Sequence, residues 1–299
     1  MRLDRQRRRV RGPPPRRGGG QPILTADPGR GSGAARRGPT EEGTHPSPEA
    51  TYEDLGYRDS FWPSRRYEDA CDRIALRALL PRRGARLIEV GAGFGRLAGE
   101  YAGHREVVLL DASEVHVEAA RSAVGGDPRV EVLLGDALAL PFPDGSFDTA
   151  VCVRVLHHFA DPAPVLRELG RVISPGGALV LEYANRRNLK AIARHLLGRQ
   201  ARSAFGPGAV AYRPHHFDHA PVSVRRALRT AGFSIERIRA VSLFRTPMVC
   251  RNLPLRLLTV AEAALQEPLG ALTPAPSVFL LARRFADPPA DRGPGGRRG

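Results

Sequence analysis

The segment between residues 87 and 111 constrains the fold more than any other part of this 299-residue chain. It begins with the apolar run 87–90, continues through a turn with Gly91, Gly93 and Gly95, and ends in a second apolar run closed by Asp111. Two buried strands joined by a crossover are typical of a parallel sheet whose ligands bind at the carboxyl ends of the strands. Glycine at the first turn lets the backbone turn sharply and approach a ligand closely.

The spacing within this segment indicates the kind of ligand. Asp111 follows Gly91 by twenty positions, where the second strand of such a unit delivers an acid to ribose hydroxyls. A dinucleotide-binding G-x-G-x-x-G pattern would require glycine at position 96, where Arg96 stands. We therefore predict a crevice for a nucleoside-containing ligand that is not a dinucleotide.

Strand-like and helix-like segments alternate along the rest of the chain. The first helical spacing, from Cys71 to Leu79, precedes the glycine turn, and Asp161 and Pro162 open a later helix. We expect strands at 87–90, 107–110, 130–133, 147–153, 178–183, from 233 and at 278–282, with helices at 95–101, 114–123, 161–172 and 224–231. This order predicts an α/β fold of the Rossmann-like, doubly wound class, with a mostly parallel seven-stranded sheet and helices on both faces.

Two insertions interrupt the alternation, after the fifth and the sixth strand. Residues 185–220 are polar and rich in arginine and histidine, and residues 247–276 contain the apolar helical stretch 255–265. Because that stretch lacks a basic polar face, we expect a helix that covers the core and not a membrane anchor.

Composition divides the chain into three parts. Residues 1–50 are rich in arginine, proline and glycine and have few large apolar side chains, so they cannot offset the entropy of ordering. We predict a disordered tail at 1–50, one folded domain at 51–285 and a second disordered tail at 286–299. A basic RNA-binding arm and a misassigned start codon are alternatives for the first tail.

The formal net charge of +15 does not by itself indicate a nucleic-acid partner. Lys190 is the only lysine, and the abundance of arginine, glycine, proline and alanine is typical of GC-rich coding. We therefore do not expect nucleic acid as the partner. Cys71, Cys152 and Cys250 are widely spaced, and no apolar run reaches 18 residues, so we expect a cytoplasmic protein without disulfides, structural metal or a membrane span.

Four segments together resemble a known family over residues 65–285. They are Glu89-Val-Gly91-Ala-Gly93-Phe-Gly95, Asp111-Ala112, Gly135-Asp136-Ala137, and the stretch that runs from Phe147-Asp148 through His157-His158 to Pro175-Gly176-Gly177. In order and spacing they resemble class I S-adenosylmethionine-dependent methyltransferases, specifically the small-molecule group similar to quinone-biosynthesis methyltransferases. The resemblance identifies the folded domain at 51–285 as a methyltransferase domain.

The resemblance implies S-adenosylmethionine as cofactor and assigns it a set of residues. Asp111 would bind the ribose hydroxyls, Asp136 the adenine amino group, and Glu89 the ammonium group. The full set that the resemblance implies is Glu89, Gly91, Gly93, Gly95, Asp111, Ala112, Asp136, Ala137, Val153 and Arg154. Taken without the family frame, either aspartate could simply cap the turn or helix that follows its strand.

The sequence indicates less about the residues that bind the methyl acceptor, because methyl transfer mainly requires alignment and exclusion of water. A base is needed only when the acceptor must lose a proton. His158, His216 and Tyr212 are the candidates for catalytic roles, whereas His157 is expected to pack against the sheet edge. For the acceptor pocket we expect polar contacts from Tyr183, Tyr212, His215 or His216 and an apolar wall from Leu255, Leu258 and Leu265.

Three functions remain open at this point. A small-molecule methyltransferase acting on an O, N or C nucleophile leads, with an apolar, ring-containing acceptor that carries one ionisable group. An RNA or other nucleic-acid methyltransferase is the second, although 153–156 lacks the Asn/Asp-Pro-Pro-Tyr type of motif and no cysteine follows a proline. A non-catalytic S-adenosylmethionine-binding module on the same fold is the third. The oligomeric state stays open.

Overall fold

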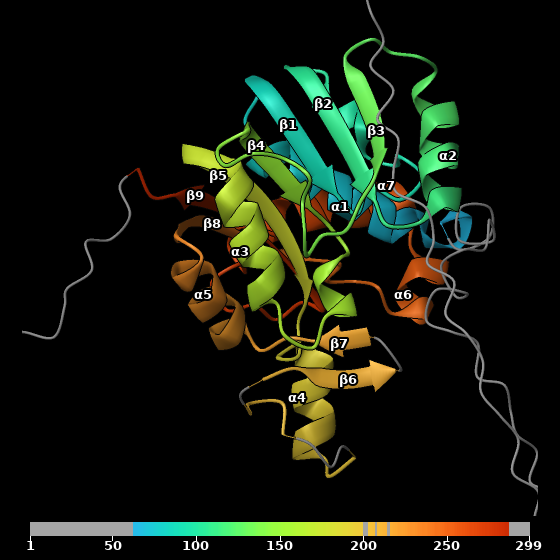
Figure 1. Cartoon of the computed structure of the whole chain (residues 1–299). Coiled ribbons are helices and arrows are strands. Elements are labelled where there is room, and N and C mark those ends of the chain that lie inside the picture. The colour runs from blue at the N-terminus through green and yellow to red at the C-terminus, as the bar shows by residue number, and fades with distance from the viewer. Residues whose placement is uncertain (1–61, 200–202, 207, 214–215, 287–299) are drawn as a thin grey trace, which may run out of the picture. The chain divides into compact units, whose positions relative to one another are not determined.

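The computed structural model describes residues 62–199, 203–206, 208–213 and 216–286 (Figure 1). The predicted first tail, 1–50, lies outside the described residues, as does all of the second tail except Ala286. The domain boundaries predicted from composition therefore stay predictions.

A seven-stranded sheet in the order β3-β2-β1-β4-β5-β9-β8 forms the centre of the described part. The strands β1 to β5 are mutually parallel, and β9 runs antiparallel to both of its neighbours. This confirms the predicted doubly wound, mostly parallel sheet. The strands are β1 Gly84–Val90, β2 His104–Asp111, β3 Val130–Leu134, β4 Phe147–Cys152, β5 Ile173–Ala184, β8 Phe233–Val241 and β9 Ser277–Arg284.

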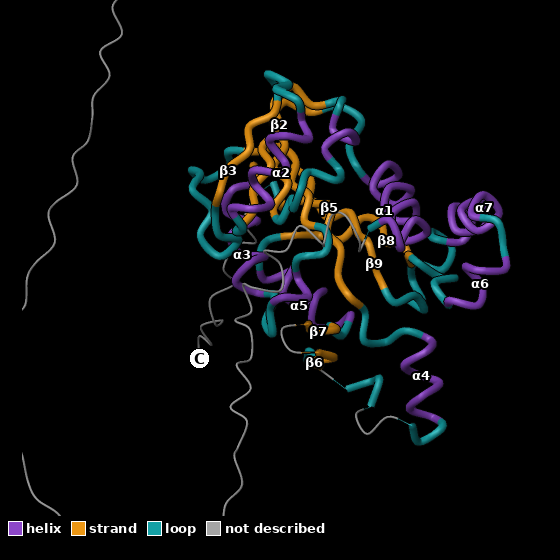
Figure 2. The backbone as a smooth tube through the Cα atoms, turned by 90° about the vertical axis from the view of Figure 1, so that its right-hand side faces the viewer, coloured by secondary structure: helices purple, strands orange, loops and turns teal. Residues whose placement is uncertain are grey.

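Helices cover both faces of this sheet, as Figures 1 and 2 show. Alternate residues of β2 explain why, since Leu109 packs in one buried cluster with α1, α2 and α7, and Leu110 packs in the other with α3 and α5. The helices are α1 Arg66–Leu79, α2 Glu114–Val124, α3 Ala163–Val172, α5 Pro221–Thr230 and α7 Leu255–Leu265.

One predicted helix is wrong. Residues 95–101 form turns and a short 3-10 helix, η4 (Ala98–Tyr101), instead of a first crossover α-helix. Gly95 has φ of 76°, a left-handed conformation that cannot start a right-handed helix. The N–H of Ala98 donates to the carbonyl of Gly95, three residues back, so the segment winds as tight turns.

Both predicted insertions are present and leave the sheet at its carboxyl edge. The first holds α4 (Leu189–Leu196) and the two-stranded pair β6 (Val210–Arg213) and β7 (His216–Asp218), which lie beyond the arrowheads of β1 and β2 in Figure 1. The second holds α6 (Pro247–Asn252) and α7.

The helix α7 covers the core, as expected. Leu258 is buried, and the buried carboxylate of Glu262 accepts hydrogen bonds from the Tyr67 hydroxyl of α1 (2.6 Å) and the Ser242 N–H (2.6 Å). Among the described residues, no helix is long and apolar enough to cross a membrane.

Candidate active site

The glycine-rich turn joins β1 to η4 at the carboxyl edge of the sheet. Gly91, Gly93 and Gly95 all have positive φ, at 75°, 54° and 76°. A Cβ on Gly91 would lie 2.1 Å from Cγ2 of Val155, so this position excludes any side chain. A Cβ on Gly93 would meet nothing within 4 Å. The turn therefore presents bare backbone to a space that a ligand can enter.

A cavity of about 360 Å³ lies at this turn, which is within the range of small-molecule sites. Gly95 does not line it, because this residue shapes the turn by donating its N–H to the carbonyl of Ala92 (3.0 Å). The other nine residues predicted to bind the cofactor line the cavity, and so does one of the catalytic candidates: Glu89, Gly91, Gly93, Asp111, Ala112, Asp136, Ala137, Val153, Arg154 and His158.

The carboxylate of Asp111 is already organised by its surroundings. One oxygen accepts the Gly93 N–H (2.7 Å), and the other accepts the Ser113 N–H (3.0 Å) and lies 3.5 Å from Nδ1 of His116. Burial alone would raise the pKa of Asp111, but the hydrogen bonds from His116, Ser113 and Gly93 outweigh burial and lower that pKa. An ionised acceptor therefore faces the cavity at neutral pH.

The carboxyl of Glu89 is the opposite case. Only 2% of the residue is exposed, and its Oε2 atom has no hydrogen-bond partner among the described residues. Burial raises the pKa of Glu89 from its usual 4.5 to about 8. A buried carboxyl with one unsatisfied oxygen at a cavity wall is costly unless a ligand cation pairs with it. The carboxyl of Glu89 therefore fits the ammonium group at the amino-acid end of a ligand.

Asp136 follows β3 and holds the local turn while it lines the cavity. Its Oδ1 atom accepts the Leu138 N–H (2.8 Å), and the preceding Gly135 donates its N–H to the Asp111 carbonyl (2.9 Å). The capping and ligand-binding interpretations of Asp111 and Asp136 are thus compatible, because each carboxylate stabilises a turn and still borders the cavity.

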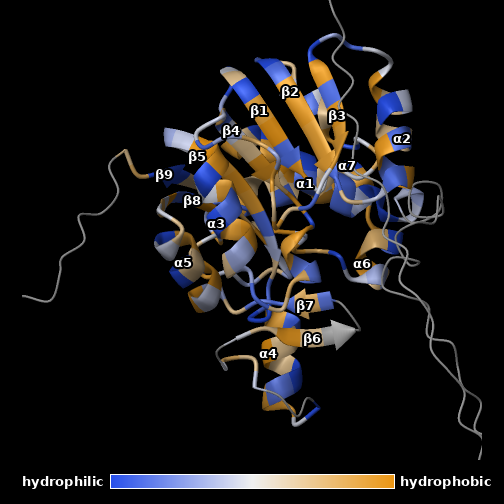
Figure 3. Ribbon diagram, in the orientation of Figure 1, coloured by the Kyte–Doolittle hydropathy of each residue, from blue (hydrophilic) through white to orange (hydrophobic). Residues whose placement is uncertain are grey.

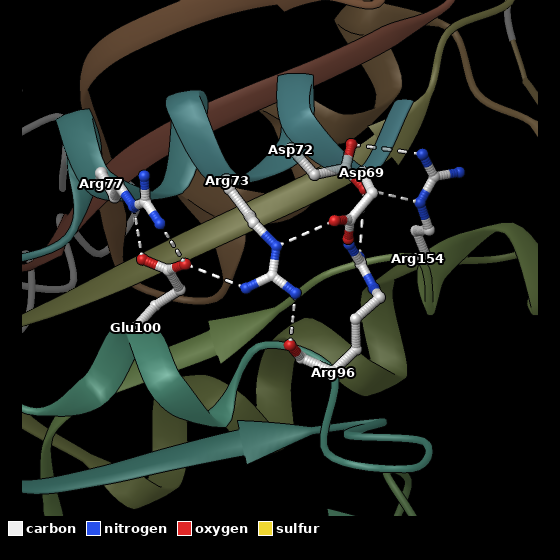
Figure 4. Close-up of polar contacts among 7 residues, drawn as sticks. All are labelled: Asp69, Asp72, Arg73, Arg77, Arg96, Glu100 and Arg154. Carbon is white, nitrogen blue, oxygen red and sulfur yellow. Dashed lines mark hydrogen bonds and ion pairs between the residues drawn. The ribbon is translucent and has the colours of Figure 1, made fainter. Parts of the chain in front are cut away.

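A network of charged side chains fixes α1 against this site (Figure 4). The guanidinium of Arg154, directly after β4, contacts both carboxylate oxygens of Asp72 at 2.9 and 3.2 Å. Arg96, from the glycine-rich loop, contacts Asp72 at 3.1 Å and also pairs with Asp69. Asp72 is fully buried, so these two arginines are the partners that offset its desolvation.

The backbone of Arg154 is constrained as well. Its φ is 60°, which is rare for a residue with a side chain, and its N–H donates to the buried carboxylate of Glu182 (2.9 Å). Strained backbone of this kind persists where the surroundings fix it, often at a functional site. Arg154 is therefore held at the cavity from both its backbone and its side chain.

Trp62, the only tryptophan, closes one side of the cavity. The guanidinium of Arg96 lies 3.8 Å from the centroid of its ring, and that of Arg154 lies 5.1 Å away. Sequence reasoning missed Trp62 and the roles of Arg96 and Asp72. The available signal was the position of Arg96 directly after the glycine motif, together with acids at 69 and 72 on one face of a helix.

Three histidines from two separate segments stack beside the cavity. The ring of His157 lies 4.0 Å from that of His158 and 4.4 Å from that of His216, measured between centroids. Burial, followed by the neighbouring histidines, lowers the pKa of His157 well below its usual value, so its ring is neutral. The structure thus brings the catalytic candidates His158 and His216 together through His157, although only His158 lines the cavity.

Two of the residues predicted for the acceptor pocket, Tyr183 and Leu258, are core residues. Tyr183 and Leu258 are buried in the two core clusters, at 2% and 3% exposure, so neither faces the cavity. Leu255 packs against the core as well, and Leu265 lies away from the cavity wall. The side chains of Tyr183 on β5 and Leu258 on α7 pack in the core instead of facing a ligand. The side chain of Tyr212 and the whole of His215 lie outside the described residues.

Known proteins share this fold and this sequence pattern. The sequence profile of the methyltransferase domain family matches residues 88–181, which run from β1 to β5 and contain most of the cavity wall. Over these residues the chain is similar to the class I S-adenosylmethionine-dependent methyltransferases. S-adenosylmethionine is the methyl donor of this family, and the open glycine turn, the ionised Asp111 and the unsatisfied Oε2 atom of Glu89 fit it.

Two relatives of this chain are named for small-molecule substrates. The 27-O-demethylrifamycin SV methyltransferase of Amycolatopsis mediterranei is 37% identical over 134 residues, which cover 42% of this chain and 48% of that protein. The demethylmenaquinone methyltransferase of Clavibacter sepedonicus is 39% identical over 111 residues, which cover 36% and 45%. The matched region spans less than half the length of either relative.

Solved structures agree on the fold. A methyltransferase from Thermotoga maritima superposes with a TM-score of 0.55 and covers 78% of this chain and 97% of its own, at 22% identity. At that identity the likeness concerns the fold alone. It includes the mixed seven-stranded sheet with its antiparallel strand β9.

Proposed function

We propose that this protein transfers the methyl group of S-adenosylmethionine to a small-molecule acceptor. The observation that carries the proposal is the pairing of two carboxyls at one cavity. Asp111 is held ionised by hydrogen bonds, and Glu89 is buried with its Oε2 atom unsatisfied among the described residues. A ligand with vicinal hydroxyls and an ammonium group satisfies both.

Each cavity residue then has a distinct role. The turn at Gly91 and Gly93 admits the amino-acid end and the ribose, Asp111 accepts the ribose hydroxyls, and Glu89 faces the ammonium group. Asp136 and Ala137 border the adenine side. When bound, S-adenosylmethionine supplies a methyl group already activated by the sulfonium. The protein contributes alignment and the exclusion of water, to which Trp62 and the apolar cavity wall are suited.

The acceptor approaches from the side of the two insertions, which leave the sheet after β5 and β8. His158 lines the cavity and is stacked on His157, so we assign it the role of general base for acceptors that lose a proton. His216, and Tyr212 on β6, remain the second group of candidates. The names of the two relatives, which refer to a demethylrifamycin and to demethylmenaquinone, support a small acceptor.

Calorimetry tests the cofactor assignment. We expect S-adenosylhomocysteine and S-adenosylmethionine to bind in the micromolar range and NAD not to bind. Binding of NAD without binding of S-adenosylhomocysteine would contradict the proposal.

Transfer of radiolabel from S-adenosylmethionine tests the acceptor class. Extracted metabolites, total RNA and total DNA serve as parallel acceptors, and label is expected in the metabolite fraction. Label in RNA or DNA would favour the nucleic-acid alternative. Cofactor binding without transfer to any fraction would favour the binding module. A cytoplasmic location belongs to this proposal, because all three cysteines are free.

A further inference from the structure

The first insertion has an unusual charge composition. Residues 183–217 contain no aspartate or glutamate, although the chain has 31 such residues in 299. The same stretch carries the only lysine and six arginines: Lys190, Arg186, Arg187, Arg194, Arg199, Arg202 and Arg213. A run of cations without any acid is a candidate surface for an anionic partner.

The helix α4 turns an apolar stripe toward solvent within this stretch. Its start is fixed by Asn188, whose side chain accepts the Ala191 N–H (2.9 Å). Leu189 and Leu196, two helical turns apart, are 63% and 75% exposed, and Leu197 is 65% exposed. Ala191, on the opposite side, is buried. Most surface helices bury their apolar stripe against the core, whereas α4 turns these leucines toward solvent.

Phe205 extends the stripe and cations border it. The Phe205 ring is 54% exposed, lies 6.3 Å from the ring of His195, and has the guanidinium of Arg187 at 5.3 Å. Lys190 and Arg199 are exposed and form no ion pair with an acid in the described part of the chain. We call this surface, formed by Leu189, Leu196, Leu197, Phe205, Arg187, Lys190 and Arg199, the α4 surface.

Arg186 differs from the cations of the α4 surface, because its guanidinium holds the backbone of a loop. It donates to the carbonyls of Ser203 (2.6 Å) and Gly208 (3.1 Å) and thereby ties the loop after α4 to the end of β5. The loop is thus held in place without help from the α4 surface. In the described part of the chain, Leu189, Leu196 and Leu197 belong to neither buried core cluster.

We propose that the α4 surface docks the protein on an anionic lipid bilayer. Leu189, Leu196 and Leu197 would enter the boundary between headgroups and acyl chains, while the flanking cations contact the lipid phosphates. This combination of an apolar stripe with bordering lysine and arginine is what an interfacial helix requires. Figures 1 and 2 place α4 at the periphery of the molecule, and Figure 3 shows its apolar and polar sides.

The same features disfavour two other occupants. A nucleic acid would pair with the cations but would leave the exposed leucines without an apolar partner. A second copy of the chain on the same surface would bring the cations of both copies together, and Lys190 and Arg199 have no ion-paired acid among the described residues to offset that repulsion. The docking does not depend on methyl transfer.

Vesicle sedimentation with the full chain tests the proposal. The vesicles are phosphatidylcholine alone or phosphatidylcholine with an equal share of phosphatidylglycerol. We expect the wild-type chain to sediment with the anionic vesicles only. The double variant Leu196→Gln/Leu197→Gln should bind at least about tenfold more weakly, because it lacks two apolar side chains that the bilayer would bury.

The matched control is Leu257→Gln/Val260→Gln, which removes two exposed apolar side chains of α7 (56% and 68% exposed) outside the α4 surface. It should bind like the wild type. Circular dichroism melts of both double variants report whether each is folded. Equal sedimentation of the two double variants would overturn the proposal, because binding would then rest on charge elsewhere in the chain.

A tryptophan probe reports insertion directly. Leu197→Trp should shift its emission to shorter wavelength with the anionic vesicles, whereas Leu257→Trp should not. An unshifted Leu197→Trp spectrum in sedimenting protein would overturn the proposal. So would a dimer, seen by analytical ultracentrifugation, that Leu196→Gln/Leu197→Gln dissociates, since the leucines would then serve self-association.

Discussion

The side chain of Arg154 and the carboxylate of Asp72 form a two-point ion pair across 82 residues of sequence, with N–O distances of 2.9 and 3.2 Å. The pair links the carboxyl end of β4, where Arg154 lines the cavity, to the middle of α1. Since Arg96 of the glycine-rich loop shares the same carboxylate, Asp72 connects three segments that surround the cofactor cavity.

Asp72→Asn should therefore destabilise the fold and weaken cofactor binding together. Breaking a buried ion pair leaves uncompensated charge and costs about 3 kcal/mol of unfolding free energy. Asp69→Asn is the matched control, because Asp69 lies on the same helix, also pairs with Arg96, and keeps 28% of its side chain exposed. Its cost should be about 1 kcal/mol. Urea unfolding measures both, and equal costs would contradict the role assigned to Asp72.

Asp111→Asn should lower affinity for S-adenosylhomocysteine by about 1.5–3 kcal/mol, because the ribose hydroxyls lose a charged acceptor. The amide retains one oxygen for the Gly93 or Ser113 N–H, so we expect a smaller loss of stability than with Asp111→Ala. Calorimetry of the folded protein and a thermal melt separate the two effects. A collapsed melt with unchanged affinity per folded molecule would make Asp111 purely structural.

Glu89 predicts a pH dependence of stability. Its pKa is raised from 4.5 to about 8, so the stability it contributes is fully present below pH 4.5 and is lost as the pH rises toward 8. In Glu89→Gln this loss of stability is absent, because the amide does not ionise. Relative to the wild type, the variant should gain stability progressively between pH 4.5 and 8, as measured by urea unfolding at several pH values. A constant difference across that window would contradict the prediction.

Cofactor binding should also release a proton through Glu89. The ammonium group favours the ionised carboxyl and lowers its pKa, so binding below pH 8 expels the proton that the free protein holds. Calorimetry with S-adenosylhomocysteine at pH 7 in two buffers of different ionisation enthalpy measures the release. In Glu89→Gln the buffer dependence should be lost. Proton uptake, or identical release in the variant, would argue against this role.

The convergence of most of the proposed cofactor residues on one cavity was predictable because their positions are determined locally in the sequence. The turn at Gly91, the strand-end acid Asp111 and the turn at Asp136 each follow a short apolar strand, so position along the chain fixes position in space. Gly95 was assigned to the cavity by the same logic, but its left-handed backbone turns it toward the core side of the loop.

The rest of the site depends on contacts between distant segments. Nothing local indicates that Asp72 meets Arg154, or that His216 reaches His157. The helix predicted at 95–101 failed for a related reason, because apolar spacing cannot report the left-handed φ of Gly95. Tyr183 was misassigned to the acceptor pocket since an aromatic residue at a strand end is equally suited to the core.

Deletion of residues 1–50 should leave the melting temperature and the cofactor affinity unchanged, because this segment has few apolar anchors. A deletion of residues 1–65 is the informative comparison. It also removes Trp62, whose ring packs on Arg96 at the cavity, and should weaken binding of S-adenosylhomocysteine. A protein that loses affinity already with the shorter deletion would place a binding contact within residues 1–50.

Replacement of the histidines should separate catalysis from binding. His158→Gln removes a titratable ring at the cavity wall, and His216→Gln removes one that stacks on the far side of His157. If His158 is the base, its loss lowers kcat by about 10²–10⁴-fold and abolishes the acidic limb of the pH–rate profile, while affinity for S-adenosylhomocysteine changes little. His157→Gln serves as control, because burial keeps that ring neutral and its loss should act on stability.

Once an acceptor is known, kcat, pH profile and cofactor affinity are measured for all three variants. Equal losses of kcat and cofactor affinity in His158→Gln would place this histidine in the cofactor site, and the assignment of a base would have to be abandoned.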